Sequence, residues 1–282
     1  MIIGRFAQLI LCLAVAALRL RAQSPTLDTA AAAKALAELD TACAADGAQT
    51  WGRSLCGPMI LVDLRHSTVV ANHADPQGRL RPWNNVFVGA WLDSIGVANT
   101  AIDWANMRWA TARLPLPEDR FDRLTLLLHE SFHREQKSLG LSSTDPANPQ
   151  LDERDGRYWL RLELNALGKA VTASDVAPAR QYARDAVLFR AERYRLFPGA
   201  DTTERELEMQ EGLAAFTGER LAVDAGAGDL AGVGSRLVDW QQTSSYPRSF
   251  AYATGPGLGF VLDRFDRQWR SRIRVRHALG AF

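Results

Sequence analysis

Two histidines separated by three residues can hold one metal ion when the segment between them is helical. The stretch His129-Glu130-Ser131-Phe132-His133 has this spacing within a segment of helical apolar periodicity. Both imidazoles therefore lie on one helix face, one turn apart. Glu130 falls about 100° around the helix, beside the position of a metal-bound water rather than among the ligands. Two ligands and a general base are the set with which a zinc ion, Zn²⁺, activates water for hydrolysis.

A catalytic zinc ion needs a third protein ligand and one open position. No histidine occurs in the six residues after His133, so the third ligand is expected among acids on a later helix. Glu211 is the first candidate, because Gly212 after it permits close helix packing, and Glu208 is the alternative. The simpler interpretation is two solvated helix histidines beside a surface acid. Only five histidines occur in the chain, and two of them have this spacing around a glutamate, which favours the metal site.

Two later segments resemble a known family. Residues 211–216 read Glu-Gly-Leu-Ala-Ala-Phe and are similar to the Glu-Gly-Phe-Ala-x-Tyr segment of gluzincin metallopeptidases, including the glycyl aminopeptidases. Residues 252–256 read Tyr-Ala-Thr-Gly-Pro and resemble that family's Tyr-x-Lys-Gly-Ala segment. The resemblance covers residues 98–265. It implies a zincin-like catalytic unit, zinc ligands at His129, His133 and Glu211, a general base at Glu130, and an oxyanion hydrogen-bond donor at Tyr252.

The sequence also departs from the family pattern. Thr254 stands where the family has lysine, and Gln210 stands where asparagine often precedes the ligand glutamate. The second histidine and Glu211 have 211 − 133 − 1 = 77 residues between them. Two expected helices, residues 152–171 and 177–197, account for this long separation. The insertion that contains them, between the two motifs, could narrow the cleft or act as a lid.

The strand with which the family's aminopeptidases bind a substrate amino terminus, Gly-x-Met-Glu-Asn, is absent. The comparable residues, 103–107, read Asp-Trp-Ala-Asn-Met. Strict aminopeptidase specificity is therefore not expected, and an endopeptidase or a peptidase with unusual substrates is favoured. Asn106 could bind substrate backbone if it lies on an edge strand of the cleft. Trp104 and Trp109 are predicted to be core residues.

Three further side chains have two interpretations each. Glu204 and Glu208 precede Glu211 by seven and three residues, which places all three on one helix face. They form either a solvated acidic stripe or outer support that holds a ligand histidine by its second ring nitrogen. Tyr252 is either the oxyanion donor or a core tyrosine beside a glycine-rich turn.

The first 22 residues have the layout of a secretory signal peptide. Arg5 precedes a mostly apolar stretch, 7–18, which is too short for a comfortable membrane span. Cleavage after Ala22 would leave 33 − 3 = 30 basic against 32 acidic residues, a formal charge of −2. We therefore expect a secreted or periplasmic protein with no stable membrane insertion and no nucleic-acid partner. Cys43 and Cys56 would remain, either as a disulfide or as two buried thiols.

The expected fold is α+β. Residues 23–117 form a β-rich lobe with a leading helix, including a hairpin at 59–62 and 68–70 and further strands at 85–88 and 98–116. Residues 118–282 form a helical lobe that begins with the histidine helix and ends with a helix over 255–274. Together the two lobes are predicted to make one catalytic unit.

The leading functional hypothesis is zinc-dependent hydrolysis of a peptide or protein substrate. A second class is a non-peptidase zinc amidohydrolase of the deformylase kind, whose third ligand is a cysteine; Cys56 lacks that family's surrounding pattern. A third class is a zincin-like binding protein without turnover. The intact Glu130 argues against that class, because a purely structural site does not need a general base. No sequence feature indicates an oligomeric state.

Overall fold

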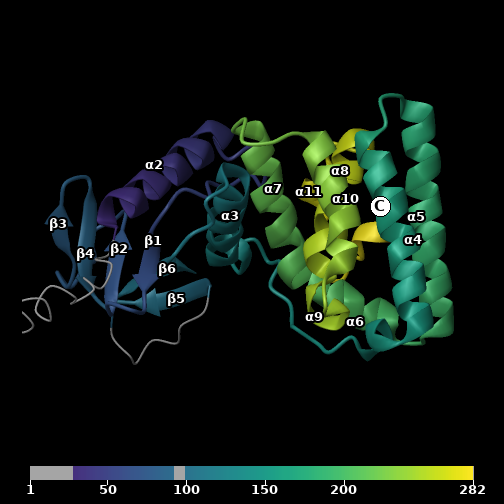
Figure 1. The fold of residues 1–282 in the computed structure, drawn as a ribbon, viewed down its shortest axis with the longest axis horizontal. Helices are drawn as coiled ribbons and strands as arrows, with labels where there is room; N and C mark the ends of the chain where they lie inside the picture. Colours follow the sequence, from purple (N-terminus) through teal and green to yellow (C-terminus); the bar gives the residue numbers. More distant parts are fainter. Residues whose placement is uncertain (1–27, 92–98, 282) are drawn as a thin grey trace, which may run out of the picture.

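The fold is α+β, as predicted, with a six-stranded mixed sheet beside a larger helical part (Figure 1). A computed structural model of the chain describes residues 28–91 and 99–281, so the predicted signal peptide lies outside the described residues. The strands are β1 (Met59–Asp63), β2 (Thr68–Ala71), β3 (Arg81–Trp83), β4 (Val86–Ala90), β5 (Thr100–Trp104) and β6 (Met107–Arg113). Their order is β3-β4-β2-β1-β6-β5, which makes β5 an edge strand.

Strand β1 lies in the middle of the sheet and is buried on both faces. It pairs parallel to β6 and antiparallel to β2, and the other neighbouring strands are antiparallel. Met59 and Leu61 face the main core with the helices, whereas Ile60 and Val62 face a smaller core on the opposite side. This alternation follows from the two-residue period of a strand. The smaller core contains Trp104 and Trp109, as the sequence predicts.

The helices pack against one face of the sheet and then against one another (Figure 1). They are α2 (Thr29–Asp46), α3 (Arg120–Gln136), α4 (Arg154–Thr172), α5 (Val176–Leu196), α6 (Ala200–Leu207), α7 (Leu213–Asp224), α8 (Leu230–Asp239), α9 (Tyr246–Ser249), α10 (Ala251–Phe265) and α11 (Trp269–Arg272). A five-residue π-helix, Glu208–Gly212, joins α6 to α7. Short 3-10 helices occur at Pro149–Asp152, Trp240–Gln242 and Leu279–Ala281.

Helix α3 lies between the sheet and the rest of the helices and contacts both (Figure 1). The Asp119 side chain caps it by accepting a hydrogen bond from the backbone N–H of Asp122. The leucines at 124, 127 and 128 are fully buried, so the back of this helix belongs to the core. This packing fixes the opposite face of α3, which carries both histidines.

Two details differ from the sequence-based expectation. The short edge strand β3 was not expected, because Pro82 lies inside it and proline disfavours central strands. The helix expected over 255–274 instead ends at Phe265. The Asp266 backbone leaves helical geometry there, and its side chain accepts a hydrogen bond from the N–H of Gln268. The break lets Trp269 pack against Trp51 in the core.

A disulfide joins Cys43, in α2, to Cys56, in the loop before β1. It ties the leading helix to the central strand and confirms one of the two predicted alternatives for these cysteines. None of the helices in residues 28–91 and 99–281 is long and apolar enough to cross a membrane. The disulfide is compatible with an extracellular location.

Replacing both cysteines by alanine is expected to lower the free energy of unfolding by roughly 2–4 kcal/mol, because the unfolded chain loses a loop closure. Urea denaturation followed by circular dichroism measures this change. Adding reductant to the wild-type protein is the control and should lower its midpoint to that of the double variant. Equal midpoints for the oxidised wild type and the variant would show that the disulfide does not stabilise the fold.

Candidate metal centre

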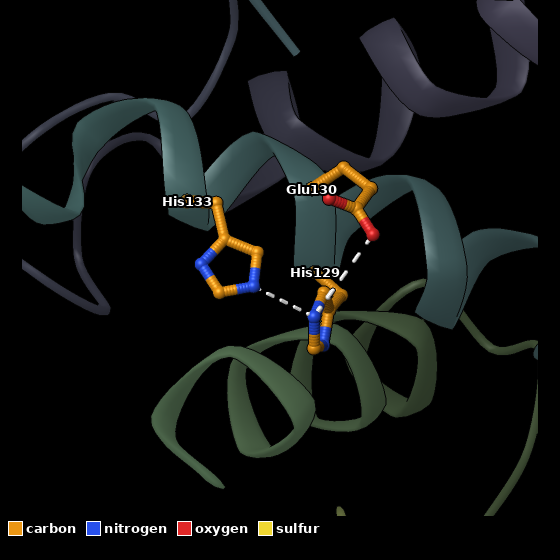
Figure 2. A group of neighbouring side chains, drawn as sticks. All are labelled: His129, Glu130 and His133. Atoms are coloured by element: carbon orange, nitrogen blue, oxygen red, sulfur yellow. Dashed lines mark hydrogen bonds and ion pairs between the residues drawn. The ribbon is translucent and has the colours of Figure 1, made fainter. Parts of the chain in front are cut away.

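His129 and His133 lie one turn apart on the face of α3 that points toward the green helical segment packed against it (Figure 2). Both side chains are largely buried, and their Nε2 atoms are 2.9 Å apart. Glu130 lies beside them, and the three residues form a group whose ligand atoms are within 4.8 Å of one another. The sequence-predicted helix therefore brings the histidines together as expected.

Glu211 reaches the same point from the π-helix. Its Oε2 atom is 3.3 Å from the Nε2 of His129 and 3.3 Å from the Nε2 of His133. The π-helix adds a residue to one helical turn, a feature that often occurs at functional sites. Behind Glu211, Gly212 packs directly on Gly255 of α10, where a Cβ on Gly255 would lie 2.3 Å from the Gly212 Cα. The two glycines thus let the π-helix and α10 meet backbone to backbone.

The three donor atoms form a triangle with edges of 2.9, 3.3 and 3.3 Å. Ligands about 2.0–2.2 Å from a tetrahedral zinc ion are about 3.3–3.6 Å from one another, so two edges fit this spacing and the third is slightly short. Two imidazole nitrogens and one carboxylate oxygen are also a known catalytic zinc donor set. The residues present therefore fit a zinc ion, which His129, His133 and Glu211 would hold.

Gln136 determines which nitrogen of His133 is free. Its Nε2 donates to backbone carbonyls, including those of Met209 and Gln210 in the π-helix, so its Oε1 must point the other way. Oε1 lies 2.8 Å from His133 Nδ1 and accepts the proton carried there. In the neutral imidazole, Nε2 then has its lone pair directed at the site. Gln136 is not among the residues predicted from the sequence, although its position three residues after His133 places it on the same helix face.

Glu130 is buried, and its Oε2 atom has no hydrogen-bond partner among the described residues. Its Oε1 is 4.0 Å from His129 Nε2, just outside the donor triangle. Burial raises the pKa of Glu130 to about 8, because a carboxylate in a low-dielectric environment is costly. A carboxyl group that lies beside the donors and lacks a protein partner is suited to exchange a proton with water.

Glu211 has the opposite electrostatic state. Burial alone would raise its pKa, but hydrogen bonds with His129 and His133 outweigh burial and hold the pKa well below its ordinary value. The His133 pKa is raised although burial opposes this, because the protonated ring can donate from Nε2 to the Glu211 carboxylate; a metal ion would take the place of that proton. Glu211 is therefore ionised, as a metal ligand must be.

Tyr252, at the start of α10, lies at the rim of the site. Its hydroxyl donates a 2.7 Å hydrogen bond to Glu211 Oε2, and its ring stacks on His129 with centroids 5.5 Å apart. The side chain is 42% exposed, so it is not a core tyrosine. Tyr252, predicted from the family resemblance as an oxyanion donor, therefore lies beside the candidate donor residues, in contact with the Glu211 carboxylate.

A cleft of about 480 Å³ opens over the donor triangle. Residues of α3, the π-helix and α7 line it, and Asn99, Thr100 and Ala101 of the edge strand β5 and its approach also contribute. Asn106 does not line the cleft: it lies in the β5–β6 turn with a φ of +62°. The predicted role of Asn106 in binding substrate backbone is therefore wrong, and the edge strand contributes different residues.

Comparison with protein-family models, with curated proteins and with solved structures gives no match. The candidate site is therefore defined by its own geometry. Cys56 cannot serve as the third ligand of a deformylase-like site, because it is bound in the disulfide. The insertion between the two motifs does not act as a lid in this structure. Of residues 141–200, all described, Ser142 alone lines the cleft.

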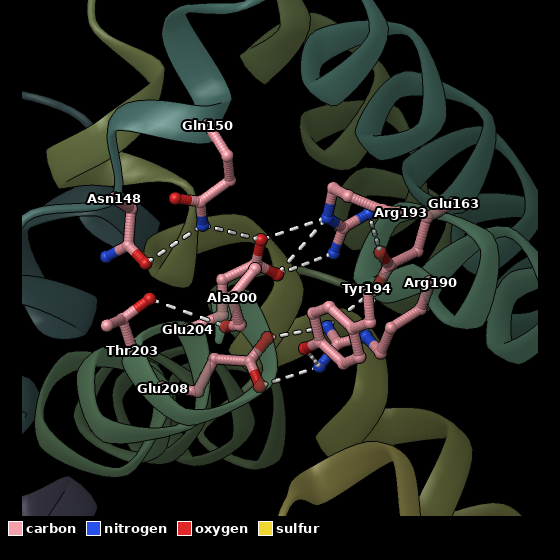
Figure 3. A network of polar contacts seen from close by, with 10 residues as sticks. All are labelled: Asn148, Gln150, Glu163, Arg190, Arg193, Tyr194, Ala200, Thr203, Glu204 and Glu208. Atoms are coloured by element: carbon pink, nitrogen blue, oxygen red, sulfur yellow. Dashed lines mark hydrogen bonds and ion pairs between the residues drawn. The ribbon is translucent and has the colours of Figure 1, made fainter. Parts of the chain in front are cut away.

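Glu204 and Glu208 are neither a solvated stripe nor a support for the histidines. Both are fully buried and form ion pairs with arginines of α5 (Figure 3). Arg193 pairs with Glu204 at 2.7 Å, and Arg190 pairs with Glu208 at 2.6 Å. Glu163 of α4 pairs with both arginines. This network joins four helical segments, α4, α5, α6 and the π-helix, and Glu208 is engaged too completely to be a metal ligand.

Gln136→Met is expected to weaken zinc binding by about 10- to 100-fold, because His133 loses the acceptor that orients its ring. Competition with a chromophoric zinc chelator measures the affinity. Gln241→Met is the control, since Gln241 is also buried but bonds to Asn165 outside the cleft. If the two variants bind zinc equally well, Gln136 does not orient a metal ligand.

Arg190→Met is expected to cost roughly 3–5 kcal/mol of folding free energy, because it leaves Glu163 and Glu208 buried with fewer countercharges. Arg195→Met on the same helix is the matched control, since Arg195 is exposed and pairs with Glu192 at the surface. Chemical denaturation compares the two. Similar midpoints would show that the buried network does not stabilise the packing of α5.

Proposed function

We propose that this chain is an exported zinc-dependent metallopeptidase with a zincin-like catalytic unit of the gluzincin type. The observation that supports the proposal most directly is the convergence of His129, His133 and Glu211 on one point, with Glu130 beside them. Two of these residues come from α3, and the third comes from a segment 78 positions later. Polar side chains that pair independently on a surface give no reason for three donor atoms to come together at one point.

His129 Nε2, His133 Nε2 and Glu211 Oε2 would hold the zinc ion. When bound, zinc supplies a Lewis acid that lowers the pKa of water to roughly 7 and polarises a substrate carbonyl. Glu130 accepts the proton from the attacking water and returns it to the leaving amine. The absence of a protein partner for Glu130 Oε2 supports this role, because the atom is free to bond to water.

Tyr252 is proposed to assist at the carbonyl oxygen. Its hydroxyl lies within hydrogen-bond distance of a ligand atom, so it is already at the edge of the donor triangle. Burial and the neighbouring Glu211 raise its pKa above the ordinary value, so the phenol remains a proton donor. A neutral donor aimed at the site can stabilise negative charge that develops during carbonyl attack.

Two alternatives receive less support. A zincin-like binding protein without turnover would not need a buried carboxyl beside the metal donors, and Glu130 is such a group. A non-peptidase zinc amidohydrolase remains the second enzyme class, because the zinc donor set alone does not determine which kind of amide bond is hydrolysed. The position of the edge strand β5 along the cleft favours a peptide, since an extended chain can pair with an exposed strand edge.

Purified mature protein is expected to contain one zinc ion per chain by elemental analysis. Glu211→Ala should retain much less zinc after dialysis against a weak chelator, because the site loses its only anionic ligand. Glu130→Gln should retain zinc. A wild-type protein that takes up no zinc after metal supplementation would contradict the proposed function.

Glu130→Gln is also expected to lower peptide hydrolysis by about 10²- to 10⁴-fold, the contribution of a general base. A library of internally quenched fluorescent peptides measures the activity. Glu135→Gln is the control on the same helix, since Glu135 pairs with Arg53 and does not line the cleft. Full activity in Glu130→Gln would rule out this mechanism.

A further inference from the structure

The cleft extends along α7 beyond the metal donors and reaches a second glutamate. Glu211, Ala215 and Glu219 are spaced by four residues, so they lie on one helix face, and all three line the cleft. Eight residues of helix span about 12 Å. An extended peptide spans this distance in about four residues. A substrate whose scissile bond lies at the donor triangle can therefore also reach Glu219.

The Glu219 carboxyl has no partner in the protein. Neither of its oxygens forms a hydrogen bond or ion pair with any residue in the described ranges, and Oε2 is enclosed. Folded proteins rarely leave a buried carboxyl group unpaired, because its desolvation costs several kcal/mol. Elsewhere in this chain the buried glutamates at 163, 204 and 208 all pair with arginines. Glu130 and the half-buried Glu219 have no arginine partner among the described residues, and both line the cleft.

The charged groups around Glu219 do not form an ion pair with its carboxyl group in the described residues. The charge of Arg236 in α8 acts on Glu219, but Arg236 is 2.6 Å from Asp122 of α3 and lies over the Phe121 ring. Burial and Asp122 raise the pKa of Glu219 to about 8, although Arg236 opposes them. With no ligand present, the carboxyl is therefore mostly protonated at neutral pH. A cation placed beside it would shift it to the ionised form.

A second unpartnered polar atom lies in the same part of the cleft. Thr125 of α3 lines the cleft, and its Oγ1 is enclosed without a hydrogen-bond partner among the described residues. Gly218, next to Glu219, packs on the Thr125 backbone carbonyl, where an added Cβ would lie 2.3 Å from that oxygen. A carboxylate and a hydroxyl oxygen can both accept hydrogen bonds from an ammonium or guanidinium group.

There is also space for a side chain. A neighbouring cavity of about 630 Å³ shares Glu219 and Tyr252 with the cleft and continues toward α8. A substrate that occupies the cleft can thus place a long side chain or its end past Ala215 and against Glu219.

We propose that Glu219 and Thr125 form a subsite that binds a cationic nitrogen of the substrate, supplied by a lysine or arginine side chain or by a free amino terminus. This inference rests on the proposed peptidase function for the nature of the substrate. It assigns the substrate preference to a charge pair formed about 12 Å from the metal donors along α7. Glu219 is a specificity residue here, because it does not touch the reacting bond.

The test measures binding before turnover. Zinc-loaded Glu130→Gln protein is titrated with fluorescent peptides in which one position, scanned along the peptide, is lysine or its uncharged isostere norleucine. Each peptide is prepared with a free and with an acetylated amino terminus. We expect at least tenfold tighter binding of the cationic member of one pair. Dependence on a scanned lysine identifies a side chain as the source, and dependence on acetylation identifies the amino terminus.

Adding Glu219→Gln should abolish this preference while binding of the norleucine peptides changes little. Thr125→Val should reduce it. Glu153→Gln is the matched control, because Glu153 is an exposed acid outside the cleft, and it should leave the preference intact. Thermal unfolding of the Glu219→Gln protein is expected to show no loss of stability, since the variant removes an unpaired buried acid. Equal binding of charged and neutral peptides, or a preference that survives Glu219→Gln, would overturn the inference.

Hydrolysis by the wild-type protein is measured on the same peptides and separates this inference from the proposed function. Peptides that bind with a Glu219-dependent preference but are never cleaved would contradict the peptidase function and leave the cationic subsite in place. Cleavage at equal kcat/KM for charged and neutral peptides would support the peptidase and overturn the subsite.

Discussion

The hydrogen bonds of Gln136 connect the two chain segments that make the candidate metal centre. Its Oε1 accepts from His133, and its Nε2 donates to the carbonyls of Met209 and Gln210, immediately before Glu211. One amide thus fixes the ring of a ligand histidine and the backbone of the ligand glutamate together. The oxygen of a side-chain amide accepts hydrogen bonds, and its nitrogen donates them. The Gln136 amide can therefore make both contacts in only one orientation. The lone pair of His133 Nε2 is directed at the site as a consequence.

The other side of the π-helix is held by packing and by buried charge. Gly212 and Gly255 bring α10 into backbone contact with it, and any larger side chain at Gly255 would push Tyr252 and Glu211 apart. One turn earlier, Glu208 is held by Arg190 of α5. A metal site tolerates little displacement of its ligands, so a segment carrying a single ligand has to be fixed from several directions. The long insertion between the motifs therefore contributes to the site from behind, through α5, rather than by covering the cleft.

The sequence predicts the local features of this molecule well and the long-range ones poorly. Apolar periodicity and turn residues are local, and they locate β1, β2 and α3 to within a few residues. The spacing of His129 and His133 on one helix is local too. Glu211 could be predicted as the third ligand, although it lies far along the sequence from the histidines, because a glycine follows it and the segment resembles a family motif. Gln136, Thr125 and Glu219 carry no such signal, because their importance depends on which segments pack against them. The predicted roles of Glu208 are wrong for the same reason. Its helical spacing from Glu211 does not show whether its side chain meets the histidines or the arginines of α5.

Three glutamates in one cleft differ in charge state because they differ in partners. Glu211 faces two imidazoles, which keep it ionised, and this suits a metal ligand. Glu130 is buried beside the same histidines without a hydrogen bond to Oε2, and its pKa of about 8 suits a group that takes up and returns a proton near neutral pH. The pKa of Glu219 is raised in the same way. Eight positions separate Glu219 from Glu211, about 12 Å of helix, so its carboxyl is out of hydrogen-bond range of the candidate metal donors. It is therefore not placed for proton transfer there. The remaining use for such a carboxyl is to pair with a charge that arrives with the substrate. In the proposed function, a single residue type therefore fills three roles in this cleft, and each proposed role follows from the groups that surround the carboxyl.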